Sequence, residues 1–104
     1  MAAFSAFSTP YAAPEQKGGL KTGPWTDVHA LGLVLTEMLT GRAPYPGEVA
    51  VTVELNIMSP TRPTPARHGV DVGPWEPLIA RAVSLNPAER FTDAGAFLAA
   101  LEAN

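Results

Sequence analysis

The chain has 104 residues and a formal net charge of −3, with 7 Lys and Arg against 10 Asp and Glu. This length fits one domain or a piece of a larger one, and a weakly acidic chain without a basic run argues against nucleic acid or an anionic membrane as partner. No apolar stretch approaches the ~20 residues of a membrane span, and residues 1–10 have neither the positive charge nor the apolar block of a secretory signal, so we expect a cytoplasmic protein. The absence of cysteine excludes disulfides and thiolate chemistry, and two isolated histidines do not indicate a zinc site.

The composition predicts short helices joined by long loops. Charged residues make up only 16% of the chain, against about 25% in an average soluble domain. The 11 Pro and 9 Gly interrupt regular structure, whereas Leu, Ile, Val and Phe are frequent enough for a packed core. A lightly charged surface of this kind favours a face that meets another protein.

Residues 1–25 are rich in Pro and Gly and are expected to form loops, apart from one helical turn near Pro14. Residues 26–40 are the strongest helical signal in the chain. Thr26 is a suitable N-cap, Asp27 suits the positive end of the helix dipole, and Gly41 is a typical C-terminal stop.

The helix expected over 26–40 is apolar around nearly its whole circumference. Only a narrow polar or small stripe interrupts the apolar surface, formed by His29, Gly32, Thr36 and Glu37. A helix of this kind is normally buried on most faces, so we expect it to be the centre of the fold.

Residues 48–58 are ambiguous between strand and helix. Apolar residues, mostly Val, alternate with smaller or polar residues here, which is the pattern of a strand. However, the sequence has no second strand-like run with which this strand could pair. Val49, Val53 and Ile57 share one helical face at four-residue spacing, so we expect a helix and keep the strand as the alternative.

The C-terminal part predicts two further helices, over 75–85 and 92–103. Trp75 begins the first, and Thr92 is expected to cap the second. Between them, Asn86 followed by Pro is typical of a capped short turn. The predicted fold class is therefore all-α.

Three stretches occur in a recognisable order: STPYAAPEQ at 8–16, TDVHALGLVLTEMLTGRAPY at 26–45 and NPAERF at 86–91. Together they resemble the helical C-terminal lobe of a bacterial serine/threonine protein kinase, from the end of the activation segment to the last helix. The resemblance covers nearly all of residues 1–104 and implies a partial kinase-like domain around one buried central helix, without the N-terminal lobe.

The resemblance assigns roles to three charged residues. Glu15 matches the last residue of the family's A-P-E motif, and it implies a structural ion pair with Arg90; two unrelated surface charges are the alternative. Asp27 matches the acid that supports the catalytic loop from below, and its alternative is an ordinary first-turn carboxylate.

Four residues match the family's substrate-binding loop: Ser8, Thr9, Pro10 and Tyr11. The family has one residue between the Pro and the Tyr of this loop, and that residue is absent here, so the loop departs from the usual geometry. Ser5, Ser8 and Thr9 are also possible phosphorylation sites, although a hydroxyl-rich loop near a turn is often only a loop.

An intact kinase of this family transfers a phosphoryl group from ATP with Mg²⁺, which needs a Gly-rich loop, a catalytic Lys, and the H-R-D and D-F-G motifs. None of these motifs occurs in the 104 residues. We therefore expect no catalytic residue, metal site or cofactor in this chain, and a substrate-docking function that is inactive alone.

Two alternatives remain open: a stand-alone interaction or scaffold module, and half of a split kinase completed by a partner chain. A partner carrying H-R-D and D-F-G in the native complex would separate them. The resemblance also implies an apolar face that other elements of the family cover, so self-association is a further expectation.

Overall fold

The computed structural model describes residues 11–45 and 55–104. This part of the chain contains helices, turns and loops and no strand, which confirms the all-α prediction for these residues. The elements in order are α2 (Pro14–Lys17), α3 (Pro24–Thr40), η2 (Pro65–His68), α5 (Trp75–Ala82), η3 (Pro87–Glu89) and α6 (Ala94–Glu102), where η denotes a 3-10 helix.

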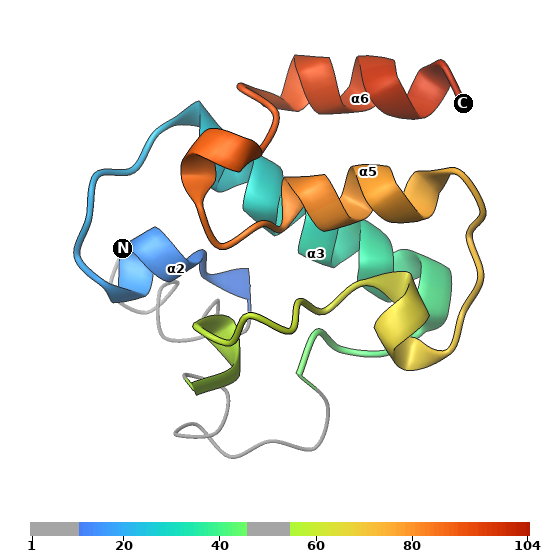
Figure 1. Cartoon of the computed structure of the whole chain (residues 1–104), viewed down its shortest axis with the longest axis horizontal. Coiled ribbons are helices and arrows are strands. Elements are labelled where there is room, and N and C mark those ends of the chain that lie inside the picture. The colour runs from blue at the N-terminus through green and yellow to red at the C-terminus, as the bar shows by residue number, and fades with distance from the viewer. Residues whose placement is uncertain (1–10, 46–54) are drawn as a thin grey trace.

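Helix α3 crosses the middle of the molecule, and most other elements pack against it. In Figure 1, α5 lies in front of α3, α6 lies above both with the C-terminus at its end, and η2 lies near the end of α3. The main core joins α3, α5 and the C-terminal segment through Val28, Ile79, Ala82, Phe91 and Phe97. The Trp75 indole N–H donates to the Leu101 carbonyl at 3.2 Å and so ties the start of α5 to the end of α6.

The start of α3 differs from the prediction, whereas its end agrees with it. Gly23 is the N-cap and the helix begins at Pro24, a favoured first residue. Thr26 therefore lies in the first turn, where its hydroxyl accepts a hydrogen bond from the Gly23 N–H at 3.1 Å. At the other end Gly41 has φ 70°, a left-handed conformation that suits glycine, and its N–H donates to the Glu37 carbonyl.

The expectation that α3 is buried on most faces is wrong for the described residues. The buried face is the one that carries the small and polar stripe, and its members are Thr26, Val28, His29, Gly32, Leu33 and Thr36. The opposite face is open, with exposed fractions of 44% for Leu31, 43% for Val34 and 77% for Met38. The reason is that α5 and its neighbours approach from one side only.

Gly32 explains why the small stripe faces inward. A Cβ atom at this position would lie 2.7 Å from Val83 Cγ1 and 3.2 Å from Ala82 Cβ, which is too close for ordinary packing. Glycine therefore lets α3 and the end of α5 approach at this point. The buried Thr36 hydroxyl is satisfied within α3, where it donates to the Gly32 carbonyl at 2.8 Å.

The remaining predicted elements are shorter than expected. Helix α5 ends at Ala82. Helix α6 begins at Ala94, and its N-cap is Asp93 rather than the predicted Thr92. The Asp93 carboxylate accepts a hydrogen bond from the Ala96 N–H at 2.8 Å. The Asn86 side chain accepts a hydrogen bond from the Ala88 N–H at 3.0 Å, which forms the capped turn predicted from the sequence. Of the helix expected over 48–58, residues 55–57 are helical and 46–54 lie outside the described residues.

The open face of α3 leads to a prediction about self-association. Leu31, Val34 and Met38 lie on one side of the helix, so the chain should associate reversibly as its concentration rises. Met38→Glu should shift this equilibrium toward the monomer without lowering stability by more than about 0.5 kcal/mol. Sedimentation velocity over a concentration series measures the equilibrium, with Leu98→Glu as a control, since Leu98 is exposed on α6. A monodisperse monomer at every concentration would contradict the prediction.

Candidate functional site

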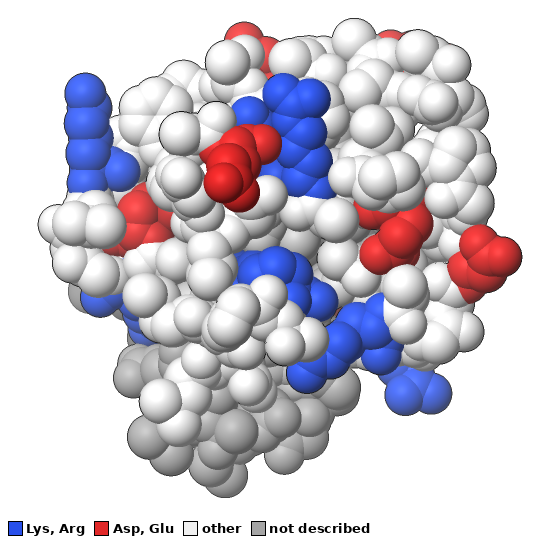
Figure 2. Space-filling model, in the orientation of Figure 1, with Lys and Arg blue, Asp and Glu red and all other residues white. Residues whose placement is uncertain are grey.

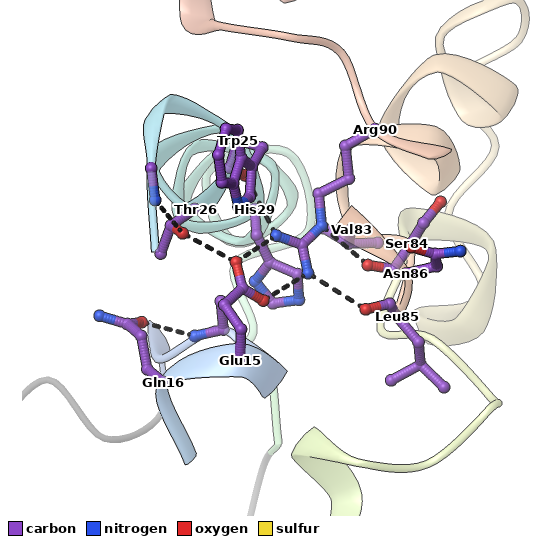
Figure 3. Close-up of polar contacts among 12 residues, drawn as sticks. Glu15, Gln16, Trp25, Thr26, His29, Val83, Ser84, Leu85, Asn86 and Arg90 are labelled. Carbon is purple, nitrogen blue, oxygen red and sulfur yellow. Dashed lines mark hydrogen bonds and ion pairs between the residues drawn. The ribbon is translucent and has the colours of Figure 1, made fainter. Parts of the chain in front are cut away.

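A buried ion pair joins the beginning and the end of the described chain. Arg90 Nη1 donates to Glu15 Oε2 at 2.6 Å, and Nη2 donates to Oε1 at 2.8 Å, so the guanidinium and the carboxylate form a bidentate, end-on pair (Figure 3). Helix α2 carries Glu15 and η3 ends just before Arg90. Their side chains are 1% and 0% exposed, which excludes the alternative of two unrelated surface charges.

The other polar atoms of this pair also have partners. Arg90 Nε donates to the Ser84 carbonyl at 2.8 Å, and Nη1 donates to the Trp25 carbonyl at 3.1 Å. Glu15 Oε2 accepts a further hydrogen bond from the Thr26 hydroxyl at 2.8 Å. The guanidinium therefore joins α2, the first turn of α3 and the loop after α5 at one point (Figure 3).

Burial alone would raise the pKa of the Glu15 carboxyl. The hydrogen bonds from Arg90, from the backbone and from Thr26, with the positive charge of Arg90, outweigh this effect and lower the pKa below its ordinary value. Glu15 is therefore ionised at neutral pH, and the pair is a charge-assisted one.

Beside this pair, His29 is fully buried and neutral. Arg62 Nη2 donates to His29 Nε2 at 2.7 Å, so Nε2 is the acceptor and the ring proton is on Nδ1, which has no hydrogen-bond partner in the described part of the chain. Burial, followed by the positive charges of Arg90 and Arg62, lowers the pKa of His29 to about 3, although Glu15 opposes the shift.

The sequence placed His29 in the polar and small stripe of the helix, but it indicated no role for Arg62. Arg62 Nε donates to the Val83 carbonyl at 2.7 Å, and Nη1 donates to the carbonyls of Ile57 and Ser59 at 2.9 and 3.0 Å. This one side chain therefore holds the Pro-rich loop against the end of α5 and against α3. The available signal was a long cationic residue in the Pro-rich stretch 59–65, which has no other charged residue.

Of the predicted substrate-loop residues, only Tyr11 is described. Its hydroxyl donates to Glu37 Oε1, and this bond attaches Tyr11, two residues before the A-P-E motif, to the C-terminal half of α3. The hydrogen bond to Glu37 is the main cause of a raised pKa of Tyr11, with burial and the Glu37 charge adding to it. Ser5, Ser8, Thr9 and Pro10 lie outside the described residues.

Asp27 is exposed in the first turn of α3 and does not take part in the Glu15–Arg90 network. Its proposed support of a catalytic loop remains a prediction. Across residues 11–45 and 55–104, no three His, Asp or Glu side chains lie close enough to hold a metal ion. No described helix has the length and apolar character needed to cross a membrane.

No protein-family model matches the chain. It is 36% identical over 96 residues to the serine/threonine-protein kinase pkn3 of Myxococcus xanthus, covering 89% of the chain and 18% of that protein. It is 39% identical over 89 residues to PrkC of Bacillus subtilis and 34% identical over 94 residues to PknL of Mycobacterium tuberculosis. Its relatives are bacterial serine/threonine-protein kinases.

The chain spans less than a quarter of the length of these kinases, namely 18%, 14% and 24%. Its fold is similar to the twitchin kinase region from C. elegans, with a TM-score of 0.73 and 24% identity over 91% of this chain and 16% of that one. A twitchin kinase fragment from C. elegans gives a TM-score of 0.70 and 26% identity. The predicted resemblance to a kinase C-terminal lobe is confirmed.

Proposed function

We propose that this chain is the substrate-docking portion of a serine/threonine protein kinase C-lobe and is not catalytically competent by itself. The observation that carries the proposal is the buried Glu15–Arg90 pair, because it fixes the A-P-E segment against the base of the helical lobe. In the proposed role, this anchor holds the preceding loop in place to receive a peptide that contains Ser or Thr.

Tyr11 extends this argument to the proposed substrate loop. Its hydroxyl is tied to Glu37, so the C-terminal end of the segment Ser8–Tyr11 starts from a fixed point on α3. Holding a binding loop in one place reduces the entropy that is lost when a peptide binds. Asp27, exposed in the first turn at the other end of α3, is proposed to support a catalytic loop in the intact kinase.

Phosphoryl transfer depends on positioning and on neutralising the charge of ATP, Mg²⁺ and the transferred group. Transfer of phosphate to protein is therefore proposed only for an intact kinase that supplies the Gly-rich loop, H-R-D and D-F-G. The open face of α3 around Val34 favours one second candidate, half of a split kinase, because a complementing chain would cover these apolar side chains.

The docking role predicts peptide binding that depends on Tyr11. A degenerate peptide library with a central Ser or Thr should bind the chain, and Tyr11→Phe should weaken binding about 5–10-fold, since one hydrogen bond is worth about 1 kcal/mol. Fluorescence anisotropy measures the affinity, and Glu37→Gln is the matched control because its amide oxygen still accepts from the Tyr11 hydroxyl.

Two results would count against this proposal. An unchanged peptide affinity of the Tyr11→Phe variant would show that the loop held by Tyr11 does not bind the peptide. Saturable, Mg²⁺-dependent binding of ATP to the chain in calorimetry would contradict the claim that it is incompetent alone.

A further inference from the structure

A polar pocket of about 330 Å³ lies away from the Glu15–Arg90 pair, where α3 ends and η2 approaches. Figure 2 shows Lys and Arg atoms gathered toward the lower right of the molecule, the region in which Figure 1 places the end of α3 and η2. Apart from two prolines, the described residues that line the pocket are Arg42, Tyr45, Asn56, Thr61, Arg67 and His68.

The described lining of this pocket carries positive charge. Arg42 and Arg67 are exposed, and their guanidinium groups form no ion pair with a carboxylate in the described part of the chain. No Asp or Glu belongs to the described lining. Burial is the main cause of a lowered pKa of His68, and the charges of Arg42 and Arg67 lower it further, so both arginines act on the same small volume.

Two residues that line the pocket each have a buried polar atom that forms no hydrogen bond of ordinary geometry among the described residues. The first is the Tyr45 hydroxyl, in a side chain that is only 8% exposed, and the second is His68 Nε2. Burial raises the pKa of Tyr45, and the charge of Arg62 together with hydrogen bonding from its guanidinium to the Tyr45 oxygen opposes this rise. A guanidinium can only donate, however, so the Tyr45 hydroxyl proton still needs an acceptor.

A buried donor without an acceptor is costly, and a ligand that accepts from it recovers this cost. We propose that the pocket binds the phosphate monoester of a phosphorylated Ser or Thr in a peptide, with Arg42 and Arg67 donating to its oxygens and the Tyr45 hydroxyl donating from below. A phosphate monoester carries about −1.5 to −2 charges and three acceptor oxygens, which match two guanidinium groups and a hydroxyl better than a single carboxylate does.

The rest of the surface favours a peptide over a polyanion. The chain has a net charge of −3, and the pocket contributes two arginines rather than an extended basic track. The proposal does not depend on the similarity to kinases, since it uses only the charges and unsatisfied atoms of this pocket. Its test contains no ATP and does not use Tyr11, so its failure is distinct from failure of the docking role.

The test is an NMR titration of the 15N-labelled chain with a peptide that carries one phosphoserine and no other charged side chain. Shifts should saturate and concentrate at residues of the pocket, and binding should weaken with salt. Arg42→Gln combined with Arg67→Gln should weaken binding at least about ten-fold. Tyr45→Phe should weaken it several-fold while the protein remains folded. Lys21→Gln, which removes one positive charge elsewhere on the surface, should bind like the parent chain.

Three ligand controls define the outcome. The unmodified Ser peptide should not bind, and the same peptide with Glu in place of phosphoserine should bind more weakly. Equal affinity for the phosphorylated and unmodified peptides, or an unchanged affinity of the double arginine variant, would overturn the proposal. Inorganic phosphate that binds as tightly as the phosphopeptide would overturn the assignment of a peptide as the source of the phosphate.

Discussion

Arg90→Met should lower the free energy of unfolding by about 3–5 kcal/mol, because Glu15 would remain buried without its positive partner. The substitution also leaves the carbonyls of Ser84 and Trp25 without their donor. Denaturant titration at pH 7 measures the loss. Arg67→Met is the matched control, since Arg67 is exposed and forms no ion pair in the described part of the chain, and it should change stability by less than about 0.5 kcal/mol.

A double-mutant cycle separates the pair from other effects of the substitution. Glu15→Met together with Arg90→Met should be more stable than the sum of the two single losses predicts, because no isolated charge is then buried. If Arg90→Met does not fold, Glu15→Gln provides the milder measurement, since the amide retains part of the hydrogen bonding. A loss for Arg90→Met no larger than that for Arg67→Met would show that the pair does not stabilise the fold.

Lowering the pH from 7 to 5 should reduce stability by about 2 kcal/mol through His29 alone. The unfolded chain takes up a proton near the ordinary pKa of 6.5, whereas burial, Arg90 and Arg62 keep the pKa of His29 in the folded chain at about 3. Protonation of His29 therefore costs no stability well above pH 6.5. As the pH falls from 6.5 toward 3, the free energy of unfolding decreases by about 1.4 kcal/mol per pH unit, because the unfolded chain binds a proton that the folded chain does not.

His29→Gln should flatten this dependence, because glutamine can accept from Arg62 but does not titrate. The measurement is the free energy of unfolding at half-unit intervals from pH 7 to 5. His68, whose pKa is also lowered, contributes over the same interval and is assessed separately with His68→Gln. The carboxyl of Glu15 titrates below this window. Parallel pH profiles for the parent chain and His29→Gln would contradict the assignment to His29.

The sequence was most informative where the signal was local. The left-handed stop at Gly41 and the capped turn at Asn86 depend on neighbouring residues, and both occur as expected. The cap at Thr92 was wrong because Asp93, a stronger N-cap, follows it directly. The cap at Thr26 was wrong because the helix begins earlier, with Pro24 as its first residue after Gly23.

Contacts over long sequence distances were accessible only through the resemblance. No periodicity relates Glu15 to Arg90, and their pairing was implied by two motifs of a known family. Arg62 belongs to neither motif, so its link to His29 was missed. The covered side of α3 was misjudged because apolar character marks every face that could be buried, whereas the small side chain of Gly32 marks the face that another helix approaches closely.

The contact between Glu15 and Arg90 spans 75 positions of the chain. During synthesis the glutamate emerges 75 residues before its partner, so this junction can close only after the whole stretch between them has been made. Closing so long a loop comes late in folding, since the entropy of closure must be overcome before the contact contributes. A shortened polypeptide that stops before η3 would therefore lack the cation that neutralises the Glu15 carboxylate, and α2 and α3 would not be held together by this pair.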